Sequence, residues 1–251
     1  MARARTAFSN AFVEIRVGNV ESRIAGPAPI ESLDRALNSR GLSAGASDEG
    51  GDKDAKDLRD SHVDKDHTTS LVFNPASGVF LSGALPEVKR VLRRSGVRFR
   101  LRDWRATAHA KEGWCLRGPP LRDYQEEVVK EAVARGRGLI DIGVGGGKSL
   151  LAAAVVAAIG LPCIWLVTTR ALLSQTLRNV RESLGVEPGV IGDGECRPTS
   201  LTVALVQSLW SRELDLTAWR GGTLVFDEGH HAAAKTYRET IQRIEPRYHY
   251  Y

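Results

Sequence analysis

The chain has 251 residues, of which 42% are hydrophobic and 26% charged, and its formal net charge is +5. It is long enough for one large domain or two small ones and can bury a core. The three cysteines form no CxxC pair and have no histidine at metal-ligand spacing, so neither a disulfide framework nor a zinc site is indicated. The basic N-terminus lacks the apolar core and cleavage site of a secretory signal. We therefore expect a protein of a reducing compartment, cytoplasmic or nuclear, and not secreted.

One segment looks like a membrane span. Residues 150–167 contain no charged side chain and approach the length that a spanning helix needs. Gly160 and Pro162 interrupt this segment, however, and its second half is rich in β-forming residues. The pattern predicts a buried helix followed by a buried strand, with no membrane contact.

The first part of the chain predicts a small basic α/β module over residues 1–112. Strand-like alternation at 12–18 precedes a short helix at 29–41, and two strand-like runs around a turn at 74–78 precede a helix at 85–96 and a strand at 97–104. Between them, residues 43–69 contain too few apolar residues to order themselves, which predicts a mobile insertion.

Charge is unevenly distributed along this module. Residues 48–66 hold eight acids and four bases, whereas residues 89–122 hold eleven Lys or Arg and two acids. A basic stripe of this kind is typical of phosphate binding to nucleic acid. It is equally typical of a solvated helix face beside an edge strand, and charge alone does not separate the two readings.

The second part, residues 113–251, alternates short apolar runs with helical ones. A helix that ends near Gly136 is followed by apolar runs at 138–143, 162–169, 201–207 and 223–228, with helical patterns at 148–160 and 170–185. This alternation predicts βαβ units and a parallel sheet covered by helices. The strands lack polar alternation, as expected when both faces of the sheet are buried.

The segment GLIDIGVGGGKSLLAAA, residues 138–154, has the strand–loop–helix order of a phosphate-binding loop. Glycines allow successive amide groups to point at a phosphate, and the helix start adds its positive dipole end. Lys148 would reach the β- and γ-phosphates, and the Ser149 hydroxyl would bind Mg²⁺. The full pattern requires glycine where Ile142 stands, so a flexible glycine-rich turn remains the alternative for the segment alone.

A second segment, TLVFDEGHH at residues 223–231, places two carboxylates after an apolar strand. The ends of neighbouring parallel strands meet where a phosphate loop lies. Asp227 would hold Mg²⁺ and Glu228 would orient and deprotonate the attacking water. A solvated acidic turn is the alternative. His230 and His231 have no third ligand in sight, which argues against a metal pair.

Six segments in order resemble the first RecA-like lobe of superfamily 2 helicases and translocases: LRDYQ, GVGGGKS, LVTTRALLSQ, VIGDG, VALVQSL and FDEGHH. They are most similar to the DEAH-type subgroup, which includes phage branch-migration helicases and repair-associated DNA translocases. The likeness spans residues 119–243. It implies an α/β fold in which a RecA-like P-loop lobe follows the small N-terminal module.

The resemblance also implies roles for single residues. The implied ATP-binding residues are Arg122, Gln125, Gly143, Val144, Gly145, Gly146, Gly147, Lys148 and Ser149, with Gln125 and nearby Arg122 at the adenine. Asp227, Glu228 and Lys148 would be catalytic, Ser149 and Asp227 would hold Mg²⁺, and His230 would couple the ATP site to the rest of the motor. The implied contacts to the nucleic-acid backbone are Thr168, Thr169, Arg170, Gly192, Gly194, Gln207 and Ser208. Without its neighbours, VALVQSL would predict only a core strand.

Motors of this kind need two lobes, and the second supplies an arginine finger. The sequence stops before the Ser/Thr-Ala-Thr motif of such lobes. We therefore expect binding of ATP·Mg²⁺ and of DNA more than RNA, with hydrolysis only when a second RecA-like lobe, in trans or in a longer chain, completes the site. The alternative is a nucleotide-responsive nucleic-acid-binding fragment without turnover. A P-loop kinase or transporter ATPase is disfavoured by the DEGHH and LRDYQ segments.

Overall fold

The computed structural model describes six stretches of the chain: residues 12–38, 72–108, 112–143, 145–211, 214–227 and 234–250. The predicted insertion at 43–69, together with Val144, Glu228, His230 and His231, lies outside them. The contacts divide the chain into two compact units, Met1–Trp104 and Arg105–Tyr251. The predicted division into domains at residue 112 stays a prediction.

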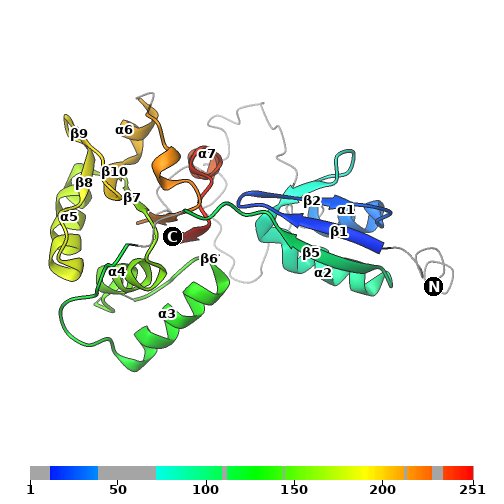
Figure 1. Ribbon diagram of the computed structural model, residues 1–251, viewed down its shortest axis with the longest axis horizontal. Coiled ribbons are helices and arrows are strands. Elements are labelled where there is room, and N and C mark those ends of the chain that lie inside the picture. Colours follow the sequence, from blue (N-terminus) through cyan, green and yellow to red (C-terminus); the bar gives the residue numbers. More distant parts are fainter. Residues whose placement is uncertain are drawn as a thin grey trace, which may run out of the picture. The chain divides into compact units, whose positions relative to one another are not determined.

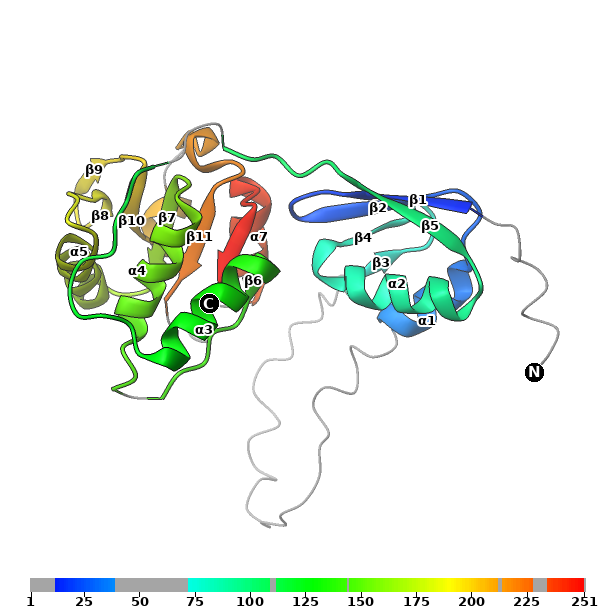
Figure 2. The same ribbon diagram turned by 60° about the horizontal axis from the view of Figure 1, so that its bottom comes forward.

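The N-terminal unit is a five-stranded sheet with two helices against one face (Figure 2). The strand order is β3-β4-β2-β1-β5, in which β1 and β5 are parallel and the other neighbours are antiparallel. The strands are β1 (Phe12–Val17), β2 (Glu21–Ala25), β3 (Phe73–Asn74), β4 (Val79–Leu81) and β5 (Arg98–Asp103), and the helices are α1 (Ile30–Asn38) and α2 (Leu85–Arg94).

Alternation along β1 explains how this unit folds. Val13 and Ile15 are fully buried, and they pack with Leu33 of α1 and with Val88 and Leu92 of α2 in one core. The residues between them on β1 point to the other face of the sheet. The predicted strands and helices of this part of the chain are confirmed, and β2 is an additional strand.

The second unit is built on a seven-stranded sheet of order β6-β12-β11-β7-β10-β8-β9. All neighbours are parallel except β8 and β9, which form an antiparallel hairpin. The strands are β6 (Arg137–Gly138), β7 (Cys163–Val167), β8 (Gly189–Gly192), β9 (Glu195–Arg197), β10 (Leu201–Leu205), β11 (Thr223–Phe226) and β12 (Tyr248–Tyr250). The predicted α/β class with a parallel sheet is confirmed.

Helices cover both faces of this sheet (Figure 1). α3, α4 and α5 lie on one side, where α4 and α5 share a core with β7 and β10, and α6 and α7 lie on the other. The helices are α3 (Asp123–Arg135), α4 (Lys148–Ile159), α5 (Arg170–Leu184), α6 (Val206–Trp210) and α7 (Ala234–Ile244).

Glycines end three of these helices, as the sequence predicts. Gly136, Gly160 and Gly185 follow α3, α4 and α5 with φ of 75°, 64° and 64°. Each takes the left-handed conformation of a helix C-cap, which is costly for residues with a side chain. The uncharged segment 150–167 accordingly forms most of α4 and then β7. None of the helices in the described ranges combines the length and the hydrophobicity of a membrane-spanning segment.

Two expectations about the phosphate-loop edge of the sheet are wrong. The predicted strand up to Gly143 ends at Gly138, because only two residues of β6 pair with β12. Residues 139–143 continue without strand pairing, and Leu139 is 69% exposed. The strand before the loop and the strand before Asp227 are also not neighbours, since β12 lies between β6 and β11.

Candidate functional site

The glycine-rich loop leads directly into α4, whose first residue is Lys148. Gly145 and Gly147 have φ of 79° and 78°, and the amide of Gly146 donates to the carbonyl oxygen of Gly143 over 3.0 Å. The first amide groups of a helix have no acceptor within the helix, and they carry the positive end of its dipole. A phosphate group fits such a helix start.

Ile142 stands where the full phosphate-loop pattern has glycine. A Cβ atom at Gly146 would lie 2.2 Å from Cγ2 of Ile142. The isoleucine side chain therefore fills the space that a side chain at position 146 would need. The pattern does not require glycine at position 146. Here it leaves room for the side chain of Ile142, so the loop keeps its tight turn.

The start of α3 holds the loop from the other side. Gln125 is 3% exposed, and its Nε2 donates to the carbonyl oxygen of Gly146 over 3.0 Å. Its Oε1 accepts from the backbone amide of Arg122 over 3.0 Å, which caps α3. The hydroxyl of Tyr124 donates to the same carbonyl of Gly146 over 2.9 Å. Gln125 thus fixes the loop relative to α3, and its role at an adenine stays a prediction.

A cavity of about 220 Å³ lies between the loop segment and the sheet. Its polar lining includes Lys148, Ser149 and Asp227, so the fold brings three of the predicted site residues to one place. Asp141 adds a second carboxylate. The apolar lining comes from the loop segment, from α4 and from three strands: Leu139, Ile140, Ile142, Leu151, Ala152, Trp165, Val225, Phe226 and Tyr250.

Asp227 directly follows β11. Its backbone amide donates to the carbonyl oxygen of Leu166 on β7 over 3.0 Å, which fixes the point where the strand ends. The next residue, Glu228, and His230 lie outside the described residues. Their predicted roles in hydrolysis and coupling stay predictions.

Asn179 is a site residue that the sequence analysis missed. From the middle of α5, its Nδ2 donates to Oγ of Ser149 over 3.1 Å. The half-buried amide lies beside the buried stripe of α5, which includes Thr176 and Val180. A polar residue next to the buried face of an amphipathic helix was the available signal, but its partner on α4 depends on the packing of two helices.

The three predicted nucleic-acid segments follow three neighbouring strands. Thr168, Thr169 and Arg170 come after β7, Gln207 and Ser208 come after β10, and the Gly192–Gly194 turn comes after β8. These strands are adjacent and parallel in the order β7-β10-β8. The segments therefore lie at the same edge of the sheet as the glycine-rich loop and Asp227.

Two of these segments contact each other at the start of α5. Thr169 is the N-cap residue, and its Oγ1 accepts from the amide of Leu172 over 3.2 Å. The guanidinium of Arg170 pairs with Asp193 of the β8–β9 turn over 3.3 Å, and the two side chains are 79% and 57% exposed. An ion pair this exposed is weak.

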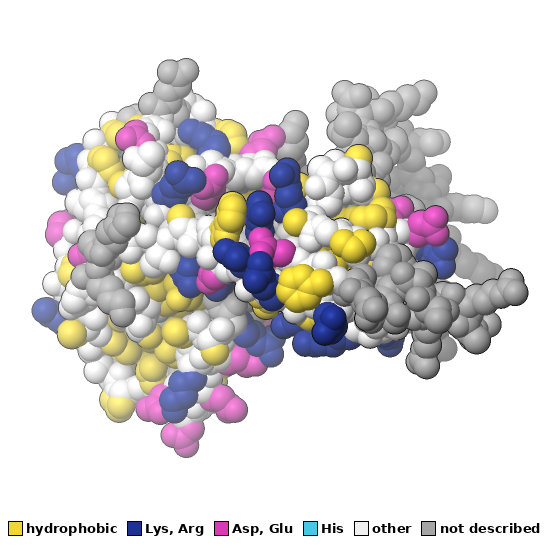
Figure 3. Space-filling view, turned by 45° about the vertical axis from the view of Figure 1, so that its right-hand side comes forward, with side chains coloured by type: hydrophobic (Ala, Val, Ile, Leu, Met, Phe, Trp, Pro, Cys, Tyr) yellow, Lys and Arg dark blue, Asp and Glu magenta, His cyan; other side chains and the backbone are white. Residues whose placement is uncertain are grey.

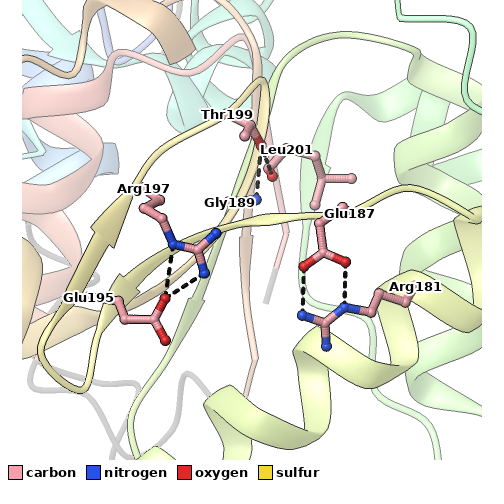
Figure 4. A network of polar contacts seen from close by, with 7 residues as sticks. All are labelled: Arg181, Glu187, Gly189, Glu195, Arg197, Thr199 and Leu201. Atoms are coloured by element: carbon pink, nitrogen blue, oxygen red, sulfur yellow. Dashed lines mark hydrogen bonds and ion pairs between the residues drawn. The ribbon is translucent and has the colours of Figure 1, made fainter.

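Contacts on both sides hold the β8–β9 hairpin (Figure 4). Arg181 of α5 pairs through two hydrogen bonds of 2.7 Å with Glu187, just before β8, and this pairing lowers the pKa of that carboxyl. Arg197 pairs with Glu195, two residues earlier on the same strand β9. Thr199 accepts from the amide of Gly189 over 2.9 Å. The hairpin is thus tied to α5 and to the start of β10.

The two glycines of this turn differ in their surroundings. A Cβ atom at Gly192 would lie 2.9 Å from Cδ1 of Leu205, so this glycine is required by packing. A Cβ atom at Gly194 would meet no described atom within 4 Å, although its φ of 86° favours glycine. In α6, Gln207 is exposed and Ser208 is half-buried. Gly194 and Gln207 are the exposed members of these two segments.

This parallel sheet, with its glycine-rich loop entering a helix and a carboxylate after a central strand, defines a RecA-like lobe of the superfamily 2 helicase and translocase class. Residues 119–249 match the protein family described as "Type III restriction enzyme, res subunit", and the chain belongs to this family.

Two relatives show the same likeness in sequence. The chain is 33% identical over 117 residues to "DNA 3'-5' translocase XPB2" of Sulfurisphaera tokodaii, a match that covers 47% of this chain and 26% of the relative. It is 31% identical over 188 residues to "Putative DNA 3'-5' helicase Rad25" of Haloarcula marismortui, covering 71% and 29%. The matched parts therefore span less than a third of either relative.

Solved structures support the fold. The crystal structure of the UvsW helicase from bacteriophage T4 matches 95% of this chain and 90% of that chain, with a TM-score of 0.63 and 13% sequence identity. A second UvsW structure matches 95% of this chain and 51% of that chain with a TM-score of 0.57. At this identity the likeness concerns the fold alone, and it extends over most of the chain.

Proposed function

We propose that this chain forms the ATP-binding and DNA-contacting part of a DNA helicase or translocase. One observation supports this most strongly: the glycine-rich loop, Asp227 and the three nucleic-acid segments share the carboxyl edge of one parallel sheet. Ligands of open α/β sheets bind at this edge. The names of the two relatives, a DNA translocase and a putative DNA helicase, support DNA as the polymer.

The lining of the cavity fits ATP with Mg²⁺. Lys148 places a positive charge at a helix start, and the hydroxyl of Ser149 and the carboxylate of Asp227 are oxygen ligands of the kind that Mg²⁺ prefers. Bound Mg²⁺ would neutralise charge on the phosphate oxygens. Asn179 holds Oγ of Ser149 in place, and Glu228 would orient and deprotonate the attacking water.

Nucleotide binding is tested with a fluorescent ATP analogue titrated into the full chain with and without Mg²⁺. Lys148→Ala should weaken binding at least about tenfold, because phosphate charge loses its partner. Lys130→Ala is the matched control, since Lys130 is an exposed lysine on α3 with only a 3.7 Å contact to Glu126. Equal affinity of the Lys148→Ala variant and the control would overturn the assignment of the site.

Hydrolysis is proposed to require a second RecA-like lobe, in trans or in a longer chain. An arginine supplied from outside the lobe can raise the rate of phosphoryl transfer by about 10³ to 10⁵. Phosphate release over many turnovers, with and without DNA, tests this requirement. Robust DNA-stimulated turnover by this chain alone, abolished by Lys148→Ala, would refute it. Absence of turnover even with a second lobe would favour a nucleotide-responsive DNA-binding fragment instead.

DNA contact at the sheet edge is tested separately. Thr169 and Arg170 lie at the start of α5, where hydroxyl, guanidinium and helix start can all meet a phosphate. Arg170→Gln should weaken DNA binding and make the slope of log affinity against log salt shallower by about 0.7 to 0.9. Arg178→Gln, on the same helix, is the control. An unchanged slope in the Arg170→Gln variant would exclude this residue from the interface.

A further inference from the structure

The N-terminal sheet has one face against α1 and α2 and an opposite face that carries arginines and aromatic rings. Cross-strand partners show which residues share this second face: Phe12 pairs with Arg98, Glu14 with Arg100, and Arg16 with Arg102. On the other side of β1, Arg16 also pairs with Arg23 of β2. We call these residues, with Trp104 directly after β5, the arginine–aromatic face.

The two rings of this face are unusually exposed for their size. Trp104 is 61% exposed and Phe12 is 50% exposed. Each lies under a guanidinium group, with Cζ of Arg16 4.7 Å from the centroid of Trp104 and Cζ of Arg100 5.7 Å from that of Phe12. These contacts orient the rings without burying them. Figure 3 shows Lys and Arg side chains gathered beside hydrophobic ones on the side of this unit that carries β1 and β5.

One carboxylate organises the arginines. Glu14, with 16% of its side chain exposed, pairs with Arg16, Arg100 and Arg102 over 2.9, 2.8 and 3.0 Å, and these contacts lower its pKa. The three arginine side chains remain 41%, 54% and 52% exposed. Each guanidinium has five N–H donors, and one carboxylate cannot accept from them all. These partly exposed side chains therefore keep donors and positive charge that a ligand can use.

The structure divides the basic stripe that the sequence analysis noted. Lys89, Arg90, Arg93 and Arg94 lie on α2, where Arg90 pairs with Glu87 and Arg93 lies over the half-buried ring of Phe99. Arg98, Arg100 and Arg102 lie on the arginine–aromatic face. The described part of α2 has no exposed aromatic ring beside its charges. Only the sheet face combines both features.

We propose that the arginine–aromatic face binds single-stranded DNA, with bases stacked on Trp104 and Phe12 and phosphates held by Arg16, Arg100 and Arg102. Exposed rings on a sheet can stack with the unpaired bases of a single strand, whereas the bases of a duplex are already stacked on one another. Phe12 lies at the start of β1, and Trp104 lies beside its last residue, Val17. At the usual rise of a strand these two ends are about 17 Å apart, a length that a few extended nucleotides span. The choice of DNA over RNA rests on the proposed function.

The experiment measures the anisotropy of a labelled oligodeoxythymidine as the full chain is added. Trp104→Ala should weaken binding of the single strand about tenfold, and Trp104→Phe should retain most of the affinity, because stacking needs a ring and not a particular one. Binding of a duplex of the same length should change much less. Equal losses for the single strand and the duplex, or no loss at all, would overturn the proposal.

Arg100→Gln tests the phosphate contacts and should make the salt slope for the single strand shallower by about 0.7. Arg94→Gln, an exposed arginine on α2, is its control and should leave the slope unchanged. Thermal unfolding of all four variants should match that of the parent, since every changed side chain is exposed. Equal or tighter binding of oligouridine would overturn the assignment to DNA. None of the changed residues lines the nucleotide cavity. The test of nucleotide binding with Lys148→Ala can therefore fail while this proposal holds, and the reverse is also possible.

Discussion

The buried side chain of His249 leads us to predict that the second unit loses stability in mild acid. This residue lies on β12, and burial, together with the nearby charge of Arg137, lowers its pKa from 6.5 to about 4. Its Nδ1 has no hydrogen-bond partner among the described atoms. The unfolded chain therefore takes up a proton near pH 6.5, while the folded chain resists it until about pH 4. Stability is fully present above pH 6.5 and declines as the pH falls through this window.

The magnitude follows from the two pKa values. One unit corresponds to about 1.4 kcal/mol, so protonation costs about 3 kcal/mol in total, of which about 2 kcal/mol is lost by about pH 5. For a unit of this size, this corresponds to a melting temperature lower by about 4 to 8 °C. The carboxyl groups of Glu14 and Glu187 have pKa values below the ordinary 4.5, so they change stability mainly at lower pH and contribute little between about pH 7 and about pH 5.

The assay is denaturant unfolding of the parent and of His249→Gln at about pH 7 and about pH 5. The glutamine variant should lose about 2 kcal/mol less than the parent over this interval, whatever its absolute stability. The remaining histidines are common to both proteins and cancel in the comparison. Identical losses in the two proteins would refute the reasoning.

Two further outcomes are expected. Gly146→Ala should weaken nucleotide binding at least about tenfold, because its Cβ would lie 2.2 Å from Cγ2 of Ile142, and adding Ile142→Ala should restore most of the affinity; additive losses in titrations of the fluorescent analogue would contradict this. Of the three cysteines, Cys163 is fully buried and its thiol pKa is raised by burial, so a thiol reagent should label the folded chain only at the two exposed ones, Cys115 and Cys196. Labelling of Cys163 before unfolding would disagree with this packing.

Local signals in the sequence were sufficient for most elements. Gly136, Gly160 and Gly185 end their helices because the left-handed conformation that closes a helix costs glycine least. Uninterrupted apolar runs gave β7, β10 and β11 because both faces of the sheet are covered. In each case the information lies within a few residues of the element it determines.

The predictions failed where a distant partner decides the structure. Residues 139–143 have strand-forming character, but no strand of the described part of the chain pairs with them, and Ile140 and Ile142 line the cavity instead. The placement of β12 between β6 and β11 depends on the order of strands in the whole sheet. For the same reason Asn179 could not be linked to Ser149, since the two residues lie thirty positions apart in sequence and on different helices.

The position of β12 leads to a prediction about which part of the lobe opens first. β12 shares two register pairs with β6 and three with β11, whereas β7 and β10 share five. The side of the sheet formed by β6 and β12 is therefore held by the fewest strand-pairing contacts among the described strands of this sheet. The amide of His249 adds one hydrogen bond there, donating to the carbonyl oxygen of Gly136 over 3.1 Å. Strands with fewer contacts open at lower free energy.

Protonation of His249 should weaken this edge before the rest of the sheet. At about pH 5, hydrogen exchange corrected for its intrinsic rate should accelerate in β12 and β6 more than in β7 and β10, and His249→Gln should remove the difference. The loop segment follows β6, Asp227 follows β11, and β12 lies between these two strands. Opening of β12 would therefore separate the glycine-rich loop from Asp227 at the cavity. Nucleotide affinity should then decline over the same pH range as the protection of β12. Equal acceleration in all four strands would show that the sheet opens as one unit and that β12 is not its weak point.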